Sequence, residues 1–188
     1  MSIRPLLNTL RLTITHLSKE SDHNICQYYL KNDSFLAATS AKRPPDFLTQ
    51  GYWEKQIDNS LKELMEGSAV RLTIRHNEAP DKIIGIVNLT QIFRGSFQAA
   101  YLGFSISESH QGQGLMKEAL TEIVRYAFEN LNLHRIMANH LVENKRSEKL
   151  LRLLGFTVEG IAKNYLYINS AWRDHVLTSL TNDIFSFR

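Results

Sequence analysis

The stretch that decides the fold is YLGFSISESHQGQGLM, which runs from Tyr101 to Met116. Its first part reads as a strand, and its second part places Gly112 and Gly114 directly before a helical pattern. The first N–H groups of a helix have no acceptor inside the helix, and glycine permits positive φ and close approach of a ligand. Such a loop can wrap a phosphate group at the positive end of a helix. A tight turn without a ligand is the alternative, because Gly-x-Gly before a helix is a weak signal by itself.

The strongest helical pattern in the chain begins where this loop ends. Its apolar residues recur three and four positions apart, which predicts a helix with one face in the core. They are Met116, Ala119, Leu120, Ile123, Val124, Ala127 and Phe128. Three strand-like runs precede the loop, over residues 69–75, 83–92 and 98–107. The turns between them are short and polar, which favours antiparallel neighbours.

Further upstream, the pattern predicts one strand and two helices. Residues 9–14 alternate apolar and polar side chains and read as an opening strand. Helical spacing predicts a first helix over residues 21–33 and a second over residues 47–65, which Gly67 ends. The apolar stripe of the second helix is Tyr52, Trp53, Ile57, Leu61, Leu64 and Met65.

Downstream, residues 135–138 read as a strand, residues 145–154 as a helix ended by Gly155, and residues 156–161 as a strand. Residues 165–168 and 172–180 form a predicted hairpin that turns at Asn169-Ser170. This order of elements predicts an α/β fold with a mixed sheet and helices packed on its faces. We find no repeat, low-complexity tract or long linker, so residues 1–188 are predicted to form one domain.

The composition is that of an ordinary globular protein, with 43% hydrophobic and 22% charged residues. No run approaches the ~20 apolar residues that cross a bilayer, and the N-terminus lacks a signal-peptide pattern, so a cytoplasmic location is expected. The single cysteine, Cys26, excludes an internal disulfide and is expected to be a small buried hydrophobe. A net charge of +3 suits an anionic cofactor and predicts neither a membrane partner nor direct DNA binding.

Several other enzyme classes lack their motifs. The seven histidines show no H-E-x-x-H or other ligand spacing, so no metal is predicted. Gly103-x-Ser105 lacks the second glycine of the hydrolase nucleophile elbow, and no G-x-x-x-x-G-K-[ST] is present. Gly112-x-Gly114 is half of a dinucleotide-binding fingerprint, but Lys117 stands at the third glycine position.

The glycine loop resembles a known cofactor loop. Gln111-x-x-Gly114-x-x is similar to the Q/R-x-x-G-x-G/A pyrophosphate loop of the GNAT N-acetyltransferases. Met116 stands where that family usually has Gly or Ala, so this helix starts with a longer side chain. The preceding run, residues 101–106, corresponds to the family's strand that carries a bulge and splays from its neighbour.

The resemblance extends over nearly the whole chain. Asn144-x-x-Ser147 and the later Gly155-Phe156 resemble the family's next helix and its ending. Thr9-x-Arg11-Leu12 and Trp172-x-Asp174 resemble the subgroup that acetylates N-terminal residues of ribosomal proteins. The implied fold is a single GNAT (acyl-CoA N-acyltransferase) domain, with a mostly antiparallel twisted sheet, splayed central strands and helices on both faces.

The resemblance implies acetyl-CoA as cosubstrate. Its pantetheine arm would lie between the splayed strands and bond to the backbone of Phe104, Ser105 and Ile106 like an added strand. A backbone N–H near Ile106 would stabilise the oxyanion, an interaction worth ~3 kcal/mol per donor. The residues that would hold the pyrophosphate are Gln111, Gly112, Gln113, Gly114, Leu115 and Met116.

Roles for three further residues follow from the same resemblance. Asn144 would contact the pantetheine, and Ser147 would also contact the cofactor and donate a proton to the departing CoA thiolate. Tyr165 is a second candidate acid. Without the family match, Ser147 would be interpreted as a helix-surface hydroxyl bonded to its own backbone.

The implied reaction is direct attack of an N-terminal α-amine, of alanine on a small-subunit ribosomal protein, on acetyl-CoA. An α-amine has a pKa of about 7.7 to 8.0, so roughly a fifth of it is neutral at pH 7.4, against about one part in a thousand for lysine. Such an acceptor needs little help from a base. Glu108, His140 and His175 are candidates to relay a proton, with structural roles as the alternative, and the base is left unassigned.

Two other functions stay open. The same chemistry can act on a small amine such as a polyamine or an aminoglycoside, or the domain can be a non-catalytic ribosome-assembly factor. Ribosome association is also left open for the enzyme. Acceptor choice is expected to depend on residues 37–57, where Tyr52 and Trp53 are placed to line a pocket while half of their stripe is core.

Overall fold

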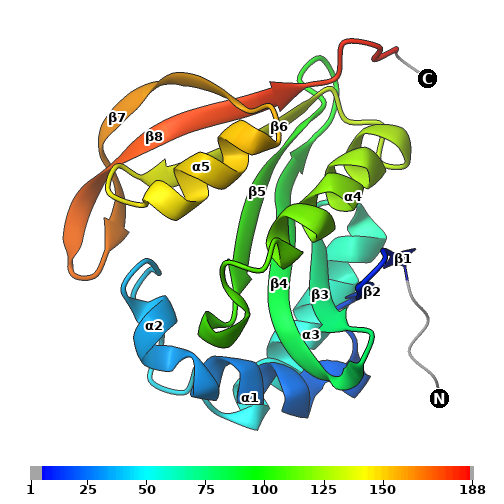
Figure 1. Ribbon diagram of the computed structural model, residues 1–188, viewed down its shortest axis with the longest axis vertical. Helices are drawn as coiled ribbons and strands as arrows, with labels where there is room; N and C mark the ends of the chain where they lie inside the picture. Colours follow the sequence, from blue (N-terminus) through cyan, green and yellow to red (C-terminus); the bar gives the residue numbers. More distant parts are fainter. Residues whose placement is uncertain (1–5, 187–188) are drawn as a thin grey trace.

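One eight-stranded sheet forms the middle of the molecule, with strand order β1-β2-β3-β4-β5-β6-β8-β7 (Figure 1). The computed structural model describes residues 6–186. The strands are β1 (Leu7–Asn8), β2 (Leu12–His16), β3 (Val70–His76), β4 (Ala79–Phe93), β5 (Ala99–Ile106), β6 (Arg135–Leu141), β7 (Thr157–Ile168) and β8 (Ala171–Thr181). Within the described residues, β5 and β6 run parallel and the other neighbouring strands are antiparallel, so the predicted mixed, mostly antiparallel sheet is confirmed.

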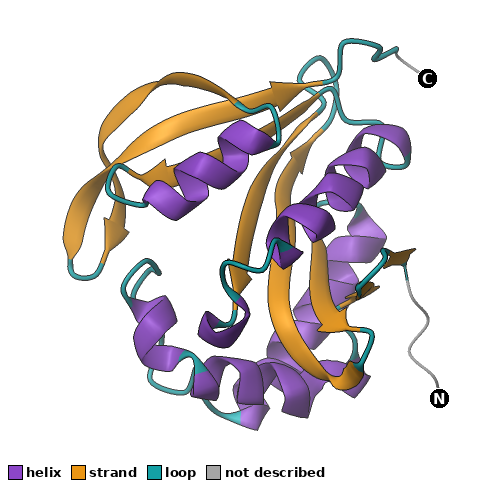
Figure 2. Cartoon of the chain, in the orientation of Figure 1, coloured by secondary structure: helices purple, strands orange, loops and turns teal. Residues whose placement is uncertain are grey.

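Helices cover both faces of this sheet (Figure 2). They are α1 (Asp22–Lys31), α2 (Asp33–Ala37), α3 (Gln50–Glu66), α4 (Leu115–Glu129) and α5 (Lys145–Leu153), with 3-10 turns η1 (Lys19–Ser21) and η2 (Glu108–His110). Residues of α1 and α3 share one apolar cluster with β4, and residues of α4 and α5 share another with β2 to β6. The sheet therefore separates two cores, as the predicted α/β layers require.

The helix after the glycine loop is the best-buried helix. Leu115, Leu120 and Ile123 are each at most 2% exposed and pack on the sheet. Burying one such side chain contributes roughly 1.5–3 kcal/mol, so this single face anchors the loop that precedes it. The structure extends the predicted helix by one residue at each end.

The central strands diverge, as the resemblance implied. β5 pairs with β6 only at its first three residues, from Ala99↔Arg135 to Tyr101↔Met137. Beyond that point β5 runs on to Ile106 while β6 turns away and pairs with β8 (Figure 1). The rest of β5 thus has a strand neighbour on one side only, which is β4.

The predicted bulge lies on a different strand. The register of β4 against β5 shifts between Thr90 and Phe93, where three steps along β4 match two along β5. Gln91 takes a positive φ of 50° at this irregularity. Residues 101–106 were expected to carry the bulge, but the extra residue belongs to β4, and the regular strand is β5.

The opening strand starts later than the alternation suggests. Thr9 does not continue a strand: its N–H donates to Leu12 O at 2.8 Å, and its hydroxyl accepts the Leu12 N–H at 2.9 Å. This closes a turn between β1 and β2. The predicted strand over residues 9–14 is therefore wrong at its start, because a local side-chain bond competes there with strand pairing.

Other differences are local. Met65 is 82% exposed, so it does not belong to the buried stripe of α3. α2 was not predicted, and residues 156–161 and 165–168 form one irregular strand, β7. Gly67 and Gly155 end α3 and α5 with φ of 68° and 88°, as predicted, and Cys26 is buried on α1.

Candidate active site

The open side of β5 presents free backbone groups. Ser107 N–H donates to Ile84 O at 2.8 Å, so this residue and every second one before it direct their N–H and C=O toward β4. The residues between them, Phe104 and Ile106, direct theirs to the opposite side, where β6 has diverged. Both predicted cofactor residues therefore lie at an edge that can accept an added strand.

Ser105 faces the other way. Its backbone points toward β4, and its hydroxyl accepts a hydrogen bond from the Tyr28 hydroxyl at 2.9 Å. Burial raises the pKa of Tyr28, which keeps the phenol protonated as a donor. Asn32, the residue that ends the same helix, accepts the Glu108 N–H at 3.0 Å, so the end of α1 fixes the end of β5. Ser105 therefore supports the strand through these bonds and does not present a free polar group at the open edge.

The glycine loop delivers free donors to the start of α4. Gly112 and Gly114 have φ of 73° and 75°, both glycines are exposed, and Gly114 is the N-cap of α4. Without a capping side chain, the N–H groups of the first turn have no acceptor within the helix. The Gln113 side chain turns back and donates to Ser109 O at 3.0 Å. The loop can thus offer backbone N–H groups to an anion.

Leu115 and Met116 contribute only their backbone to this surface. Their side chains are 2% and 6% exposed and belong to the core on this face of the sheet. A Cβ added at Gly85 would lie 3.4 Å from Met116 Cε, so the long side chain fills space beside the glycine of β4. The departure from the family's small residue is accommodated inside the core.

The start of α5 lies across the loop from the start of α4. Asn144 caps α5, because its side-chain oxygen accepts the Ser147 N–H at 3.2 Å. The Arg146 guanidinium donates to the Gln111 side chain, which joins the two helix starts. Ser147 is partly buried in the first turn. The structure therefore brings Gln111, Asn144 and Ser147 to one region, although Arg146 was not predicted to contribute.

Tyr165 is carried by an irregularity in β7. Four steps along β7, from Ala162 to Leu166, match two along β8. Asp174 holds this bulge by accepting bonds from the Asn164 N–H and from Lys163, at 2.9 and 2.6 Å, and these bonds lower the pKa of its carboxyl. Bulges often redirect a side chain next to a site. Asp174 of the Trp172-x-Asp174 element thus has a structural role, which is to hold the segment that carries Tyr165.

The redirected tyrosine lies beside β6. Asn139 donates to its hydroxyl at 3.3 Å. Burial, followed by a hydrogen bond with Tyr101, raises the pKa of Tyr165. Its phenol therefore holds its proton at neutral pH, as a proton donor must.

The three candidate bases differ in setting. Glu108 is exposed on η2. His140 and His175 are each 4% exposed, and their Nδ1 atoms lie 2.9 and 3.1 Å from the carbonyl oxygens of Leu141 and Arg173. The His175 ring lies 5.6 Å from that of Tyr165. Each buried histidine has a structural bond, and no base is assigned.

A cavity of about 160 Å³ lies between α1, α3 and the β3–β4 face of the sheet. Tyr52 and Trp53 line it, as predicted, and Trp53 is also part of the core. Asn88 lines it from β4, and its register partner on β5 is Gly103. The cavity therefore lies one strand away from the open edge of β5.

No helix within residues 6–186 combines the length and apolar character needed to cross a membrane. In the same range, no three His, Cys, Asp or Glu side chains are grouped so as to hold a metal ion.

Comparison with known proteins gives one consistent picture. Residues 11–157 match the model of the acetyltransferase (GNAT) domain. The chain is 40% identical over 175 residues to the [ribosomal protein uS5]-alanine N-acetyltransferase of Escherichia coli, covering 93% of this chain and 90% of that protein.

Solved structures agree. The ribosomal-protein-S5-alanine acetyltransferase of Vibrio fischeri superposes with a TM-score of 0.92 at 33% identity, covering 96% of this chain and 98% of that one. RimJ of Mycobacterium smegmatis, solved with CoA-disulfide, superposes with a TM-score of 0.86 at 23% identity, covering 92% and 82%, and at that identity it speaks for the fold alone.

Proposed function

The chain belongs to the acetyltransferase (GNAT) family, and we propose that it transfers an acetyl group from acetyl-CoA to the N-terminal α-amine of a small-subunit ribosomal protein, with alanine as the accepting residue. The chain is an acetyl-CoA-dependent N-acetyltransferase. The observation that carries the acceptor is the 40% identity, over 93% of the chain, to an enzyme named for alanine of uS5.

The residues at the open edge of β5 fit acetyl-CoA. Acetyl-CoA supplies an acetyl group activated as a thioester. The backbone groups of Phe104 and Ile106 have no strand partner beyond Tyr101, which supports their proposed bonding to an extended pantetheine arm. An N–H from Ile106 directed to the same side is suited to stabilise negative charge on the reacting carbonyl oxygen.

The two helix starts fit the anionic part of the same molecule. Backbone N–H groups at Gly114, Leu115 and Met116 would face the pyrophosphate, because the N-terminus of α4 carries partial positive charge and lacks a side-chain cap. The hydrogen bond between Arg146 and Gln111 borders the proposed pyrophosphate region on the side of α5. Asn144 supports it by holding the first turn of α5.

Two hydroxyls are candidates to protonate the CoA thiolate. Tyr165 has the raised pKa that a proton donor needs, and a bulge directs it toward β6. Ser147 lies on the first turn of α5, next to the proposed cofactor region. We propose Tyr165 as the donor and Ser147 as a contact to the cofactor.

An α-amine acceptor would need little help from the base, which stays unassigned. A substantial fraction of an α-amine is already neutral near pH 7.4, whereas a lysine side chain needs a strong base close by. His140 and His175 are both bonded to backbone carbonyls, which supports structural roles for them. A ribosomal acceptor would place the activity in the cytoplasm. Whether the enzyme also associates stably with ribosomes is a separate question, which needs a binding measurement with ribosomal particles.

The test is release of CoA thiol with three acceptors in parallel. They are a peptide that begins with alanine and has blocked lysines, a peptide with a blocked N-terminus and one free lysine, and spermidine. Turnover with the first alone is expected. Turnover with spermidine or the lysine peptide, and none with the alanine peptide, would contradict the proposed acceptor while leaving the family's chemistry intact.

A further inference from the structure

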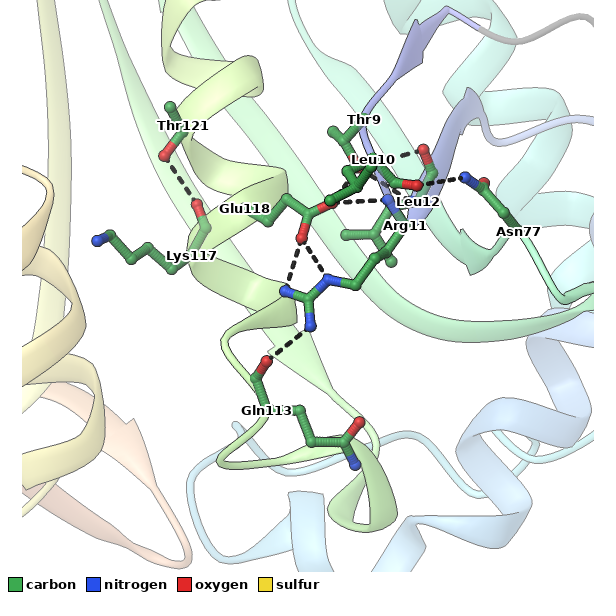
Figure 3. A network of polar contacts seen from close by, with 9 residues as sticks. All are labelled: Thr9, Leu10, Arg11, Leu12, Asn77, Gln113, Lys117, Glu118 and Thr121. Atoms are coloured by element: carbon green, nitrogen blue, oxygen red, sulfur yellow. Dashed lines mark hydrogen bonds and ion pairs between the residues drawn. The ribbon is translucent and has the colours of Figure 1, made fainter.

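Arg11 reaches from the turn between β1 and β2 to the glycine loop (Figure 3). Its Nη1 donates to Gln113 O at 3.0 Å. Its Nε and Nη2 lie 2.7 and 2.6 Å from Glu118 Oε2, and its own N–H donates to Glu118 Oε1 at 2.9 Å. A residue near the N-terminus thus fixes one particular carbonyl of the loop, 102 positions along the chain.

The direction of that carbonyl decides the direction of the next N–H. No peptide bond in the described chain is cis, and in a planar trans peptide the C=O and the following N–H point in opposite directions. Since Gln113 O points toward Arg11, the Gly114 N–H points away from it. Figure 3 shows Arg11 and Glu118 on one side of α4 and Lys117 on the opposite side. In Figure 1, α5 lies on the side of α4 opposite to β1 and β2, whose turn carries Arg11.

We propose that Arg11 is a positioning residue for cofactor binding, which turns the Gln113 carbonyl away from the pyrophosphate region and the Gly114 N–H toward it. Without this bond the peptide between Gln113 and Gly114 can flip, because the glycine on its C-terminal side restricts rotation little. A flipped peptide would present a carbonyl oxygen to a phosphate. Arg11 therefore acts through the backbone and not by contacting the cofactor.

The contacts of Arg11 support this assignment. Glu118 neutralises the guanidinium and occupies two of its nitrogens, so the side chain is held in one orientation. Thr9 adds a hydrogen bond to Glu118 at 2.5 Å. Burial alone would raise the pKa of Glu118, but the hydrogen bonds from Thr9 and Arg11 outweigh it and lower the pKa, so the ion pair persists at neutral pH.

The test is the dissociation constant of CoA, measured by titration calorimetry, for Arg11→Gln. We expect binding about tenfold weaker, the size of one lost bond from a charged group, with kcat at saturating acetyl-CoA unchanged. The matched control is Arg125→Gln. This variant removes two ion pairs, with Glu122 and Glu129, from the exposed face of α4, the helix that carries Glu118. It is expected to leave CoA binding unchanged.

A second variant separates position from charge. Arg11→Lys keeps the charge but lacks the fork that bridges Glu118 and Gln113, so it should bind CoA as weakly as Arg11→Gln. It also serves as the test if Arg11→Gln does not fold. Wild-type CoA affinity in either variant, or an equal loss in Arg125→Gln, would overturn the proposal. The proposal rests on acetyl-CoA-dependent transfer, but CoA titration needs no acceptor, so its result is independent of the acceptor proposed above.

Discussion

The starts of α3 and α4 are built in opposite ways. At α3, Thr49 has an extended backbone and its side chain accepts the Tyr52 N–H at 3.3 Å, so the helix satisfies its own first turn. At α4, Gly114 stands at the same position with a left-handed backbone and no side-chain cap. The first helix start is capped by its own sequence, whereas the second has no side-chain cap, and Arg11 bonds to the Gln113 carbonyl just before it.

The comparison shows that an uncapped helix start need not be a defect. A capping side chain typically stabilises a helix by about 1 kcal/mol, and α4 forgoes it. The extensive burial of α4 makes this affordable, because several of its core residues are 0–2% exposed. The backbone at the start of α4 is thus proposed to bind the cofactor, while buried side chains along the whole helix stabilise it.

The largest expected effect comes from placing a charge at the open start. Gly114→Asp should weaken CoA binding roughly a few hundredfold, because it adds a negative charge at the helix start proposed for the pyrophosphate, and two like charges ~5 Å apart repel by ~3.3 kcal/mol at an effective dielectric constant of about 20. The Cβ of the new side chain would also lie 3.7 Å from Arg11 Nη2, which offsets part of this repulsion. Gly114→Asn, which has the same shape without the charge, should lose much less. Titration calorimetry on both variants measures the difference.

The control is Gly67→Asp at the C-terminal end of α3. Gly67 has nearly the same φ, 68°, and open space around it, so the backbone strain is matched. This variant should be less stable but should bind CoA as the wild type does. Equal loss of CoA affinity in both aspartate variants would mean that strain, and not the open helix start, explains the effect.

Removal of the proposed proton donor should lower the rate of the reaction without changing the binding of acetyl-CoA at the start of α4. Tyr165→Phe is expected to lower kcat about a hundredfold, with the KM for acetyl-CoA unchanged, because general acid catalysis contributes roughly 10²–10⁴-fold. Tyr167→Phe, an exposed tyrosine on the same strand, is the control. Steady-state kinetics with saturating acceptor measures both, and a Tyr165→Phe enzyme with wild-type kcat would assign the acid elsewhere.

The pH profile tests the same residue. The donor must be protonated, and burial raises the pKa of Tyr165, so its contribution is retained at neutral and mildly alkaline pH and is lost as the pH rises through the raised pKa. A fall of kcat near pH 8 that disappears in Tyr165→Phe would contradict this sign. An alkaline loss centred above the ordinary tyrosine value of about 10 agrees with it.

The smallest effect is expected at the closed start. Thr49→Ala should lower the free energy of unfolding by about 1 kcal/mol and leave CoA binding unchanged, because it removes only the cap of α3. Thr121→Ala is the matched control, since its hydroxyl bonds to Lys117 O within α4 and caps nothing. Urea unfolding of both variants decides whether the cap stabilises as predicted, and equal midpoints would show that it does not.

Most of the fold was predictable because its signals are local. The helix after the loop has apolar residues at helical spacing over four turns, and the structure places it within one residue of the prediction. The alternation at residues 9–14 was misleading because Thr9 bonds to Leu12 in a turn. The break in β7 was interpreted as two strands because a bulge held by Asp174 interrupts the pattern.

The candidate site was predictable only in part, for a different physical reason. The glycine loop and the open strand are contiguous segments, so the sequence displays them directly. The bonds of Arg11 to Glu118 and Gln113 join residues more than 100 positions apart, and no local sequence pattern predicts such a contact. The inward direction of the Met116 side chain likewise depends on the space that Gly85 leaves on β4.

We expect the cofactor to bind the open edge of β5 and the open start of α4. The most direct measurement is a titration of the protein with CoA, followed by the backbone amide NMR shifts of each residue. We expect large shifts at Phe104, Ile106 and Gly114, and none at Tyr52, whose N–H is capped by Thr49. Unchanged amides at Ile106 and Gly114 in the presence of saturating CoA would contradict it.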